Sequence, residues 1–460
     1  MLINLTLENW MSFRDPVEFS MVAGRERHFR ERLPKLGSRL RVLPISLMYG
    51  ANASGKSNFV KAFLFARQLV IGYLDKAAPI PVKPFMSPET NMSPTKISFE
   101  FYSNGKIYRY YFSLNARRVF EEKLSRIFLD GSEQLLFQID RGAKKIGRKH
   151  TTNFAIAGKN QKENERLNYL LNGTWENQLF LNNSYYQRVD YFNDIVDWFS
   201  NLEVVLPNSK YGYLMDGIYQ ETNFEYLSEC LRKLDTGVDL FEMNQKPIGR
   251  DEVIKIAKSA GIEDLWGRLE ALREGDTFPI DFESLVFLKH KDGIYLLRTN
   301  TVRKDKTSGE NIEGWSLSME SDGTRRIIDL LPILPASQNA KNSKVYIIDE
   351  LERSLHPNMT GWLIDRFLSS CGEETRTQMI FTTHDVSLMD NARLRRDELW
   401  LAERDTHNNV SNIFSISDYK GVRDDTDLRK NYLRGVFGGV PKIMISNRCQ
   451  VGAKENSDEE

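Results

Sequence analysis

The stretch GANASGKSN, residues 50–58, stands between two segments of different periodicity. The apolar run 43–49 before it predicts a buried central strand, and residues 57–74 after it carry apolar side chains at helical spacing. A glycine-containing turn that joins a buried strand to a helix is typical of a phosphate-binding loop. The stretch therefore predicts an α/β fold with an anion site at the carboxyl end of the strand.

The residue types of this loop suit a nucleoside triphosphate. Its glycines let several backbone N–H groups point at a phosphate, and the helix N-terminus adds its positive dipole end. We expect Lys56 to reach the β- and γ-phosphates of ATP and the Ser57 hydroxyl to bind Mg²⁺. The expected ATP-binding set is Gly50, Asn52, Ala53, Ser54, Gly55, Lys56, Ser57 and Asn58.

The second half of the predicted site lies far downstream. The apolar stretch 345–348 predicts a strand that presents Asp349 and Glu350 at its carboxyl end. Asp349 would hold Mg²⁺ together with Ser57, and Glu350 would orient and deprotonate the attacking water. Small kinases, GTPases and hexameric motors place this motif much nearer the loop. The separation therefore favours an ABC-type head, whose fold is interrupted by an inserted segment.

Two further motifs follow the order of such a head. Ser321 and Gly323 precede an apolar-periodic stretch, 327–334, that predicts a helix, so they would form a second phosphate-binding helix end. One head cannot bring both helix ends to the same phosphate, so this end would serve the nucleotide of another protomer. The alternative is an ordinary N-cap. His384 follows the predicted strand 378–383, where it would contact the γ-phosphate and position the water.

Together these segments resemble the SMC/RecF-like ABC ATPases. The segments that carry the similarity are YGANASGKSN, ESDGTRRIIDLLP, YIIDELERSLHP and FTTHDVSLMD. They look most similar to the branch of this family that is found in bacterial phage-defence loci, which include abortive-infection, Septu, retron-associated and PARIS-type systems. The resemblance implies that Ser321 and Gly323 act across an ATP-sandwiched dimer, although SDGT stands here in place of the usual LSGGQ. The candidate for the glutamine of the Q-loop is Gln187, and the alternative is a solvated glutamine at a helix start. Phe13 or Arg14 would contact the adenine.

The expected fold class is α/β, an ABC/SMC-type P-loop ATPase head. It would combine a central mixed sheet, helices and an antiparallel β subdomain with an inserted helical subdomain. We expect residues 1–206 to form the N-terminal part of the head, 207–283 the helical insert, 284–446 the C-terminal part of the head, and 447–460 a polar tail. Within the first part, residues 97–114 predict a hairpin around Asn104-Gly105.

The composition and charge of the chain bear on its partners and on its location. The chain has 460 residues, and its formal net charge of +0 gives no bulk attraction to nucleic acid or membrane. Three isolated cysteines argue against a disulfide scaffold. The most apolar stretch, 62–74, is too short to span a bilayer, so we expect a cytoplasmic protein. One basic stretch, 141–150, contains no acidic residue and would bind either a phosphate backbone or an acidic partner.

The sequence leads to three hypotheses of function, one of which is a nucleotide-gated structural module with negligible turnover. The first is an ATP-hydrolysing sensor or scaffold of an anti-phage defence system, in which two heads close on two Mg²⁺–ATP and control a separate effector. The resemblance suggests a TOPRIM-like or HNH nuclease as this effector, since the chain itself shows no nuclease motif. The alternative is a RecF-like repair or chromosome-maintenance ATPase that binds DNA directly.

Overall fold

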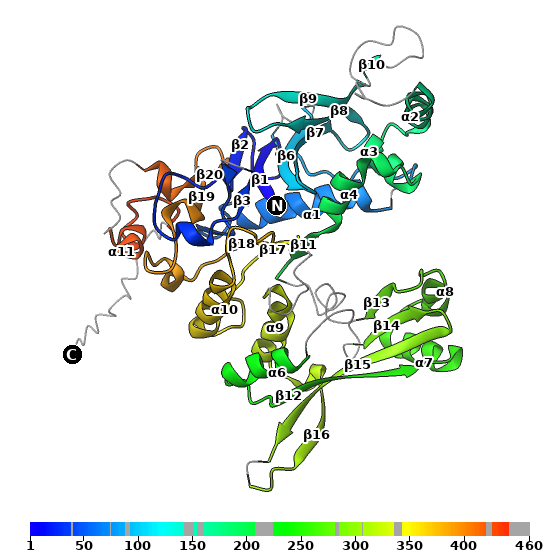
Figure 1. The fold of residues 1–460 in the computed structure, drawn as a ribbon, viewed down its shortest axis with the longest axis vertical. Helices are drawn as coiled ribbons and strands as arrows, with labels where there is room; N and C mark the ends of the chain where they lie inside the picture. Colours follow the sequence, from blue (N-terminus) through cyan, green and yellow to red (C-terminus); the bar gives the residue numbers. More distant parts are fainter. Residues whose placement is uncertain are drawn as a thin grey trace, which may run out of the picture.

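The chain folds into two bodies that lie one above the other (Figure 1). Among the described residues, the upper body holds two large sheets and a two-stranded one. The lower body, defined here as β12 to β16 with α7 and α8, holds another large sheet. The computed structural model describes residues 1–37, 40–73, 75–87, 93–141, 151–153, 161–207, 224–280, 285–305, 307–334, 343–419 and 426–440.

The central sheet has six strands in the order β11-β17-β18-β5-β19-β20. All neighbours pair in parallel except β19 and β20. The strands are β5 (Ile45–Gly50), β11 (Leu202–Val205), β17 (Val345–Ile348), β18 (Gln378–Thr382), β19 (Leu399–Arg404) and β20 (Ser411–Ser415). Every residue of β5, β17 and β18 is buried, as expected where helices or another sheet cover both faces.

An antiparallel sheet of seven strands covers one face of the central sheet, in the order β10-β9-β8-β7-β6-β1-β2. Helix α1 (Lys56–Ile71) packs between the two sheets, with Phe59 and Phe63 in their shared core. The strands are β1 (Leu2–Glu8), β2 (Val17–Ser20), β6 (Thr95–Ser103), β7 (Lys106–Leu114), β8 (Val119–Ile127), β9 (Glu133–Asp140) and β10 (Thr151–Asn153), with the small pair β3 (Lys35–Leu36) and β4 (Leu40–Arg41) beside them.

Helices cover the remaining surfaces of the upper body. Alternation along β5 sends Met48 toward α1 and Leu47 toward the opposite core, which α9 and α10 close. The helices are α2 (Gln161–Gly173), α3 (Phe180–Tyr186), α4 (Asn193–Ser200), α6 (Phe224–Lys233), α9 (Asp322–Leu330), α10 (Pro357–Ser369) and α11 (Leu428–Leu433). The predicted head, with its central mixed sheet and antiparallel β subdomain, is confirmed, as is the hairpin at Asn104-Gly105.

The inserted segment differs from the prediction because it is not wholly helical. The lower body is a sheet of antiparallel strands with its own core, flanked by α7 (Arg250–Ala260) and α8 (Leu265–Glu270). Its strands are β12 (Leu240–Pro247), β13 (Thr277–Ile280), β14 (Leu285–His290), β15 (Gly293–Lys304) and β16 (Asn311–Ser316). The expected boundary at 283–284 therefore runs through one sheet, whose ladders join β12 to β15 and β13 to β14.

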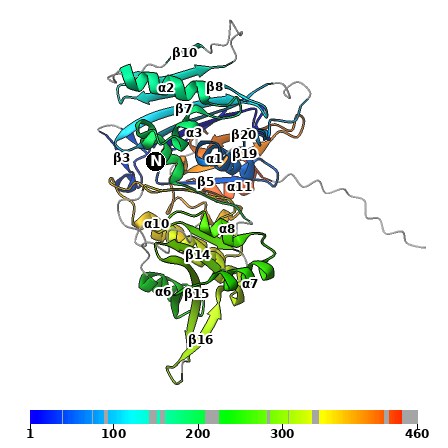
Figure 2. The ribbon, with the colours of Figure 1, turned by 90° about the vertical axis from the view of Figure 1, so that its right-hand side faces the viewer.

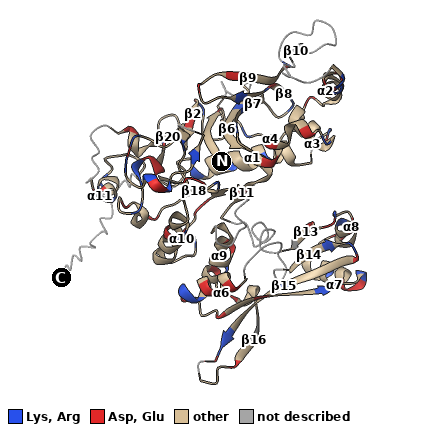
Figure 3. Cartoon of the chain, viewed as in Figure 1, with Lys and Arg blue, Asp and Glu red and all other residues tan. Residues whose placement is uncertain are grey.

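Other expectations have mixed outcomes. The basic residues 142–150 and the polar tail 447–460 lie outside the described residues. The ribbon in Figure 3 shows acidic and basic residues interspersed along both bodies, in line with the balanced composition. No helix in the described ranges is both long enough and apolar enough to cross a membrane. Seen from the side, the upper body stacks its sheets in layers above the lower body (Figure 2).

Candidate nucleotide site

The phosphate-binding loop connects the end of β5 to the start of α1. Gly55 is the N-cap of α1 and has φ +112°, a conformation that side chains with a Cβ rarely adopt. A Cβ on Gly55 would also lie 2.8 Å from the Ser411 hydroxyl oxygen. Ala53 has φ +62°, so the loop turns sharply before the helix begins. The predicted strand, turn and helix are all present.

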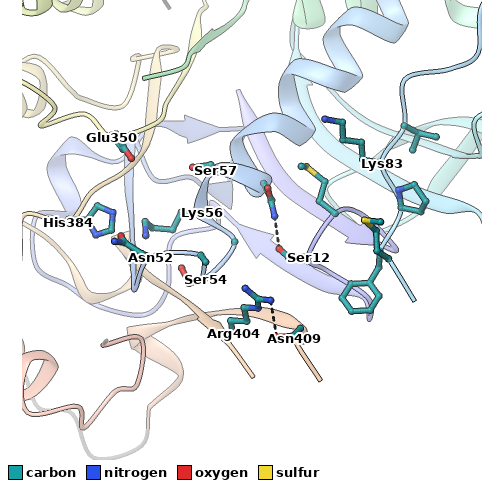
Figure 4. A pocket seen from close by; sticks show the side chains of 18 residues that line it. Ser12, Asn52, Ser54, Lys56, Ser57, Lys83, Glu350, His384, Arg404 and Asn409 are labelled. Atoms are coloured by element: carbon teal, nitrogen blue, oxygen red, sulfur yellow. Dashed lines mark hydrogen bonds between the residues drawn. The ribbon is translucent and has the colours of Figure 1, made fainter. Parts of the chain in front are cut away.

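A cavity of about 1010 Å³ opens beside this loop (Figure 4). Its lining includes Asn52, Ala53, Ser54, Gly55, Lys56, Ser57 and Asn58 of the loop and helix, together with Glu350 and His384 from the far half of the chain. Gly50 lines an adjoining cavity of about 710 Å³ that shares Asn52, Ala53, Ser54 and His384 with the first. The structure thus brings the loop, one downstream acid and the histidine around the same space.

Lys56 is buried inside the loop. Its Nζ donates to the carbonyl oxygens of Gly50 at 2.7 Å and Ala51 at 3.0 Å. Burial lowers the pKa of Lys56 to about 8, against the opposing attraction of Asp349, Glu352 and Glu350. The ammonium is therefore mainly protonated at neutral pH and lies where a phosphate beside the loop would meet it.

The two acids follow β17 and are held by the end of β18. Asp349 is buried, and its Oδ1 accepts a hydrogen bond of 2.6 Å from the Thr382 hydroxyl. Glu350 has φ +53°, which is uncommon for a residue with a side chain. Its backbone N–H donates to the same Thr382 hydroxyl at 2.9 Å. The two acids therefore differ in exposure: Glu350 lines the cavity, whereas Asp349 is buried directly after the end of β17.

His384 stands after the end of β18 and lines both cavities. Its backbone N–H donates to the Glu352 carboxylate at 2.6 Å. Burial, followed by the nearby Lys56 charge, lowers the pKa of His384, with Glu352, Glu350 and Asp349 acting in the opposite direction. The lowered pKa favours the neutral imidazole, in which one ring nitrogen donates and the other accepts.

Ser321 and Gly323 start helix α9 away from this cavity. The Ser321 hydroxyl caps α9 by accepting from the Thr324 backbone N–H at 3.1 Å. A Cβ on Gly323 would lie 2.8 Å from the carbonyl oxygen of Ser354, so glycine allows the helix to approach the turn that follows the acids. Neither residue lines either cavity within the described part of the chain. The assignment of both to another protomer's nucleotide stays a prediction.

Three suggested contacts are not brought to the cavity. Gln187 caps the end of α3 and is absent from the described lining of both cavities, so its role as the Q-loop residue stays a prediction. Phe13 cannot contact adenine in this structure because its side chain is fully buried in the core. Arg14 pairs with its neighbour Asp15 at the surface. Asn58 lines the cavity but directs its amide to the Ser12 hydroxyl at 2.9 Å.

The remaining lining comes from segments that sequence reasoning missed. The loop before β6 contributes Val82, Lys83, Pro84, Phe85 and Met86, and the β1–β2 turn contributes Met11 and Ser12. Arg404 comes from the end of β19, and Asn409 comes from the turn between β19 and β20. The backbone N–H of Met11 donates to the Lys83 carbonyl at 2.8 Å, which holds the first two segments together. The apolar residues between Val82 and Met86, which lie in a loop between two predicted elements, were a signal that could have marked this wall of the cavity.

The oxygen donors present fit a Mg²⁺ ion that is shared with a nucleotide. Mg²⁺ prefers one or two protein oxygens plus phosphate oxygens and water over an all-protein cage. The described residues contain no group of three or more His, Cys, Asp or Glu that could form such a cage. Ser57 lines the cavity, and Asp349, the residue before the cavity-lining Glu350, supplies a carboxylate bound by Thr382. These two residues would hold the ion.

Comparison with known proteins places this geometry in a family. A family model described as "AAA domain, putative AbiEii toxin, Type IV TA system" matches residues 45–390. No curated protein matches the chain.

Solved structures resemble the chain only loosely. The SMC head domain from Thermotoga maritima has 14% identity and a TM-score of 0.35, covering 90% of this chain and 98% of that one. An SMC head bound to the C-terminal winged-helix domain of ScpA has the same identity and TM-score, with coverages of 90% and 97%. The recombination mediator protein RecF-ATPrS has 10% identity and a TM-score of 0.32, with coverages of 90% and 98%. Because the family model spans about three quarters of the sequence, the chain belongs to the AAA-domain family described as putative AbiEii toxin, type IV TA system.

Proposed function

We propose that this protein binds Mg²⁺–ATP in the cavity beside residues 50–58 and hydrolyses it. The observation that carries the proposal is the meeting of Lys56 and Ser57 with Glu350 and His384 around one cavity, although nearly three hundred residues separate the two pairs. A lysine and a serine at a helix start suit the phosphates and the metal ion. A carboxylate and an imidazole that line the same cavity suit a water molecule that attacks the γ-phosphate.

Different residues of the chain would bind the phosphates, activate the water and contact the purine. Lys56 and the backbone N–H groups at the start of α1 would bind the phosphates and stabilise the charge that develops during transfer. Glu350 would accept the proton of the attacking water, and neutral His384 would orient that water by hydrogen bonding. Bound Mg²⁺ would neutralise phosphate charge. Met11, Val82 and Phe85 form an apolar part of the cavity wall that suits a purine ring.

We infer further that two copies close on two ATP molecules. Ser321 and Gly323 stand at an exposed helix start and away from the cavity of their own chain. A helix start of this kind suits an anion carried by another molecule. The nucleotide of a second copy of this chain would supply that anion, so the dimer would form only with ATP bound and would separate after hydrolysis.

The biological role that we propose is a cytoplasmic sensor or scaffold in an anti-phage defence system. The family description names a toxin of a type IV TA system, which supports a place in a defence locus. The destructive chemistry would belong to a separate effector, such as a TOPRIM-like or HNH nuclease, that ATP-dependent dimerisation controls. The alternative is a RecF-like ATPase that acts on DNA directly.

Affinity purification from the native genomic context tests this role. The wild-type protein is compared with Lys56→Ala by mass spectrometry and by staining for nucleic acid before and after nuclease treatment. We expect a stoichiometric protein partner whose recovery changes in Lys56→Ala. Recovery of DNA without a protein partner, together with turnover that DNA stimulates, would contradict the scaffold role and support the RecF-like alternative.

A further inference from the structure

Thr382 is the last residue of β18, and its buried hydroxyl contacts both acids of the site. The hydroxyl donates to Asp349 Oδ1 at 2.6 Å and accepts the backbone N–H of Glu350 at 2.9 Å. In addition, the Thr382 carbonyl oxygen accepts the backbone N–H of Leu351 at 3.1 Å. One residue of a neighbouring strand therefore holds three consecutive residues after β17.

The chemistry of a hydroxyl makes this arrangement specific. A threonine hydroxyl has one proton and two lone pairs. An ionised carboxylate only accepts hydrogen bonds and a backbone N–H only donates, so the hydroxyl proton must point to Asp349 and a lone pair must face Glu350. Neither contact can form with a valine, which has nearly the same shape. A serine keeps both.

The backbone of Glu350 needs such support. Its φ of +53° lies in the left-handed region, where a residue with a Cβ is held only by its surroundings. Thr382 binds the N–H of Glu350, and Arg326 of α9 donates to its carbonyl oxygen at 3.2 Å. The conformation that directs Glu350 to the cavity is thus fixed on both sides of the residue.

We propose that Thr382 is a positioning residue for ATP hydrolysis, which orients Asp349 for the metal ion and Glu350 for the attacking water. The inference rests on the proposed ATPase function. Groups that orient a metal ligand change metal affinity or activity by about 10- to 100-fold when they are removed. The effect should therefore appear in the response to Mg²⁺ as well as in turnover.

The test compares Thr382→Val and Thr382→Ser in the full-length chain. The matched control is Thr360→Val, because Thr360 is a fully buried threonine of α10 whose hydroxyl has no hydrogen-bond partner among the described residues. Calorimetry measures ATP affinity with Mg²⁺ and with EDTA, and a steady-state assay measures kcat and KM. Thermal unfolding verifies that each variant is folded.

We expect Thr382→Val to lower kcat by about 10- to 100-fold and to shrink the gain in ATP affinity that Mg²⁺ gives. ATP affinity in EDTA should stay unchanged. Thr382→Ser should keep most of the wild-type kcat and most of the wild-type response to Mg²⁺. Thr360→Val should behave as wild type. A folded Thr382→Val with wild-type kcat and wild-type Mg²⁺ response would overturn the inference. Absence of turnover in the wild-type protein would instead contradict the proposed function, while the Mg²⁺ response would still test Thr382.

Discussion

The guanidinium of Arg326 donates a hydrogen bond from Nη2 to the carbonyl oxygen of Glu350 at 3.2 Å. Arg326 belongs to α9, the helix that Ser321 caps, and Glu350 lines the candidate nucleotide cavity. The helix proposed to bind a second copy's nucleotide is therefore tied to the proposed general base of its own chain. A movement of α9 on dimerisation would reach Glu350 through this contact.

The Arg326 contact can be removed with little change of shape. Arg326→Met keeps a long buried side chain but leaves the Glu350 carbonyl without this donor, so the free energy of unfolding should fall by about 1–3 kcal/mol. We expect a lower kcat with ATP affinity retained. Chemical denaturation and steady-state kinetics measure the two effects.

The control is Arg325→Met on the same helix. Arg325 forms an ion pair with exposed Asp322, and an exposed pair contributes at most about 1 kcal/mol. Equal kinetics for the two variants would show that Arg326 has no special relation to Glu350.

Ser321 has two roles that one substitution can separate. Aspartate is as good an N-cap as serine, so Ser321→Asp should leave stability unchanged. Its negative charge would repel the γ-phosphate of a second copy's ATP, so the ATP-dependent dimer should not form. Light scattering in a Glu350→Gln background, where hydrolysis is blocked, measures the dimer. Ser321→Asn serves as the uncharged control, and a normal dimer of Ser321→Asp would refute the contact across copies.

A partly buried ion pair links the lower body to the start of α9. Arg303 of β15 binds both carboxylate oxygens of Glu320, at 2.9 and 2.8 Å, immediately before Ser321. Arg303→Met should lower the free energy of unfolding by about 1–3 kcal/mol, because the buried Glu320 carboxylate loses its bidentate partner and keeps the Thr301 hydroxyl as a donor.

Adding Glu320→Gln to Arg303→Met should recover part of that loss, since no unpaired charge remains. Equilibrium denaturation of both single variants and the double variant measures this coupling. If the losses in free energy of unfolding of the two single variants simply add up in the double variant, Arg303 and Glu320 do not couple the lower body to α9.

Asp329 of α9 makes stability depend on pH. Burial raises the pKa of Asp329 to about 7, although Arg326 and Arg325 act in the opposite direction. The folded state then keeps a proton that the unfolded state has released, so this contribution to stability is full below about pH 4 and is lost as pH rises to 7. Asp329→Asn should therefore be more stable than wild type at pH 8 and equal to it near pH 4. Thermal unfolding across this range measures the difference, and parallel pH profiles would contradict it.

The sequence was sufficient for the elements that carry strong local patterns. Residues 50–57 combine glycines, a lysine and a serine between a buried strand and a helix, and the φ of Gly55 requires a glycine at that position. The acids after β17 were recognisable because an all-apolar strand ends there. The parallel sheet then brings the carboxyl ends of β5 and β17 to the same edge.

Parts that depend on distant contacts were not predictable in this way. Strand β12 lies at the edge of its sheet, and most of its residues are exposed, so its sequence shows no apolar alternation that would predict a strand. Its hydrogen-bonded ladder with β15 makes it a strand. The wall from Val82 to Met86 reaches the cavity through its contact with the β1–β2 turn. The role of Thr382 depends on the pairing of β17 with β18, which places its hydroxyl beside residues more than thirty positions earlier.

Hydrolysis of ATP by the purified full-length chain, wild type beside Glu350→Gln, tests the central claim most directly. Release of phosphate is measured with Mg²⁺ present, and ATP affinity is measured for both proteins. We predict turnover by the wild type, and a loss of at least about 100-fold in Glu350→Gln with ATP affinity retained, as expected when a general base is removed. Equal rates in the two proteins, or no turnover by the wild type, would contradict the account.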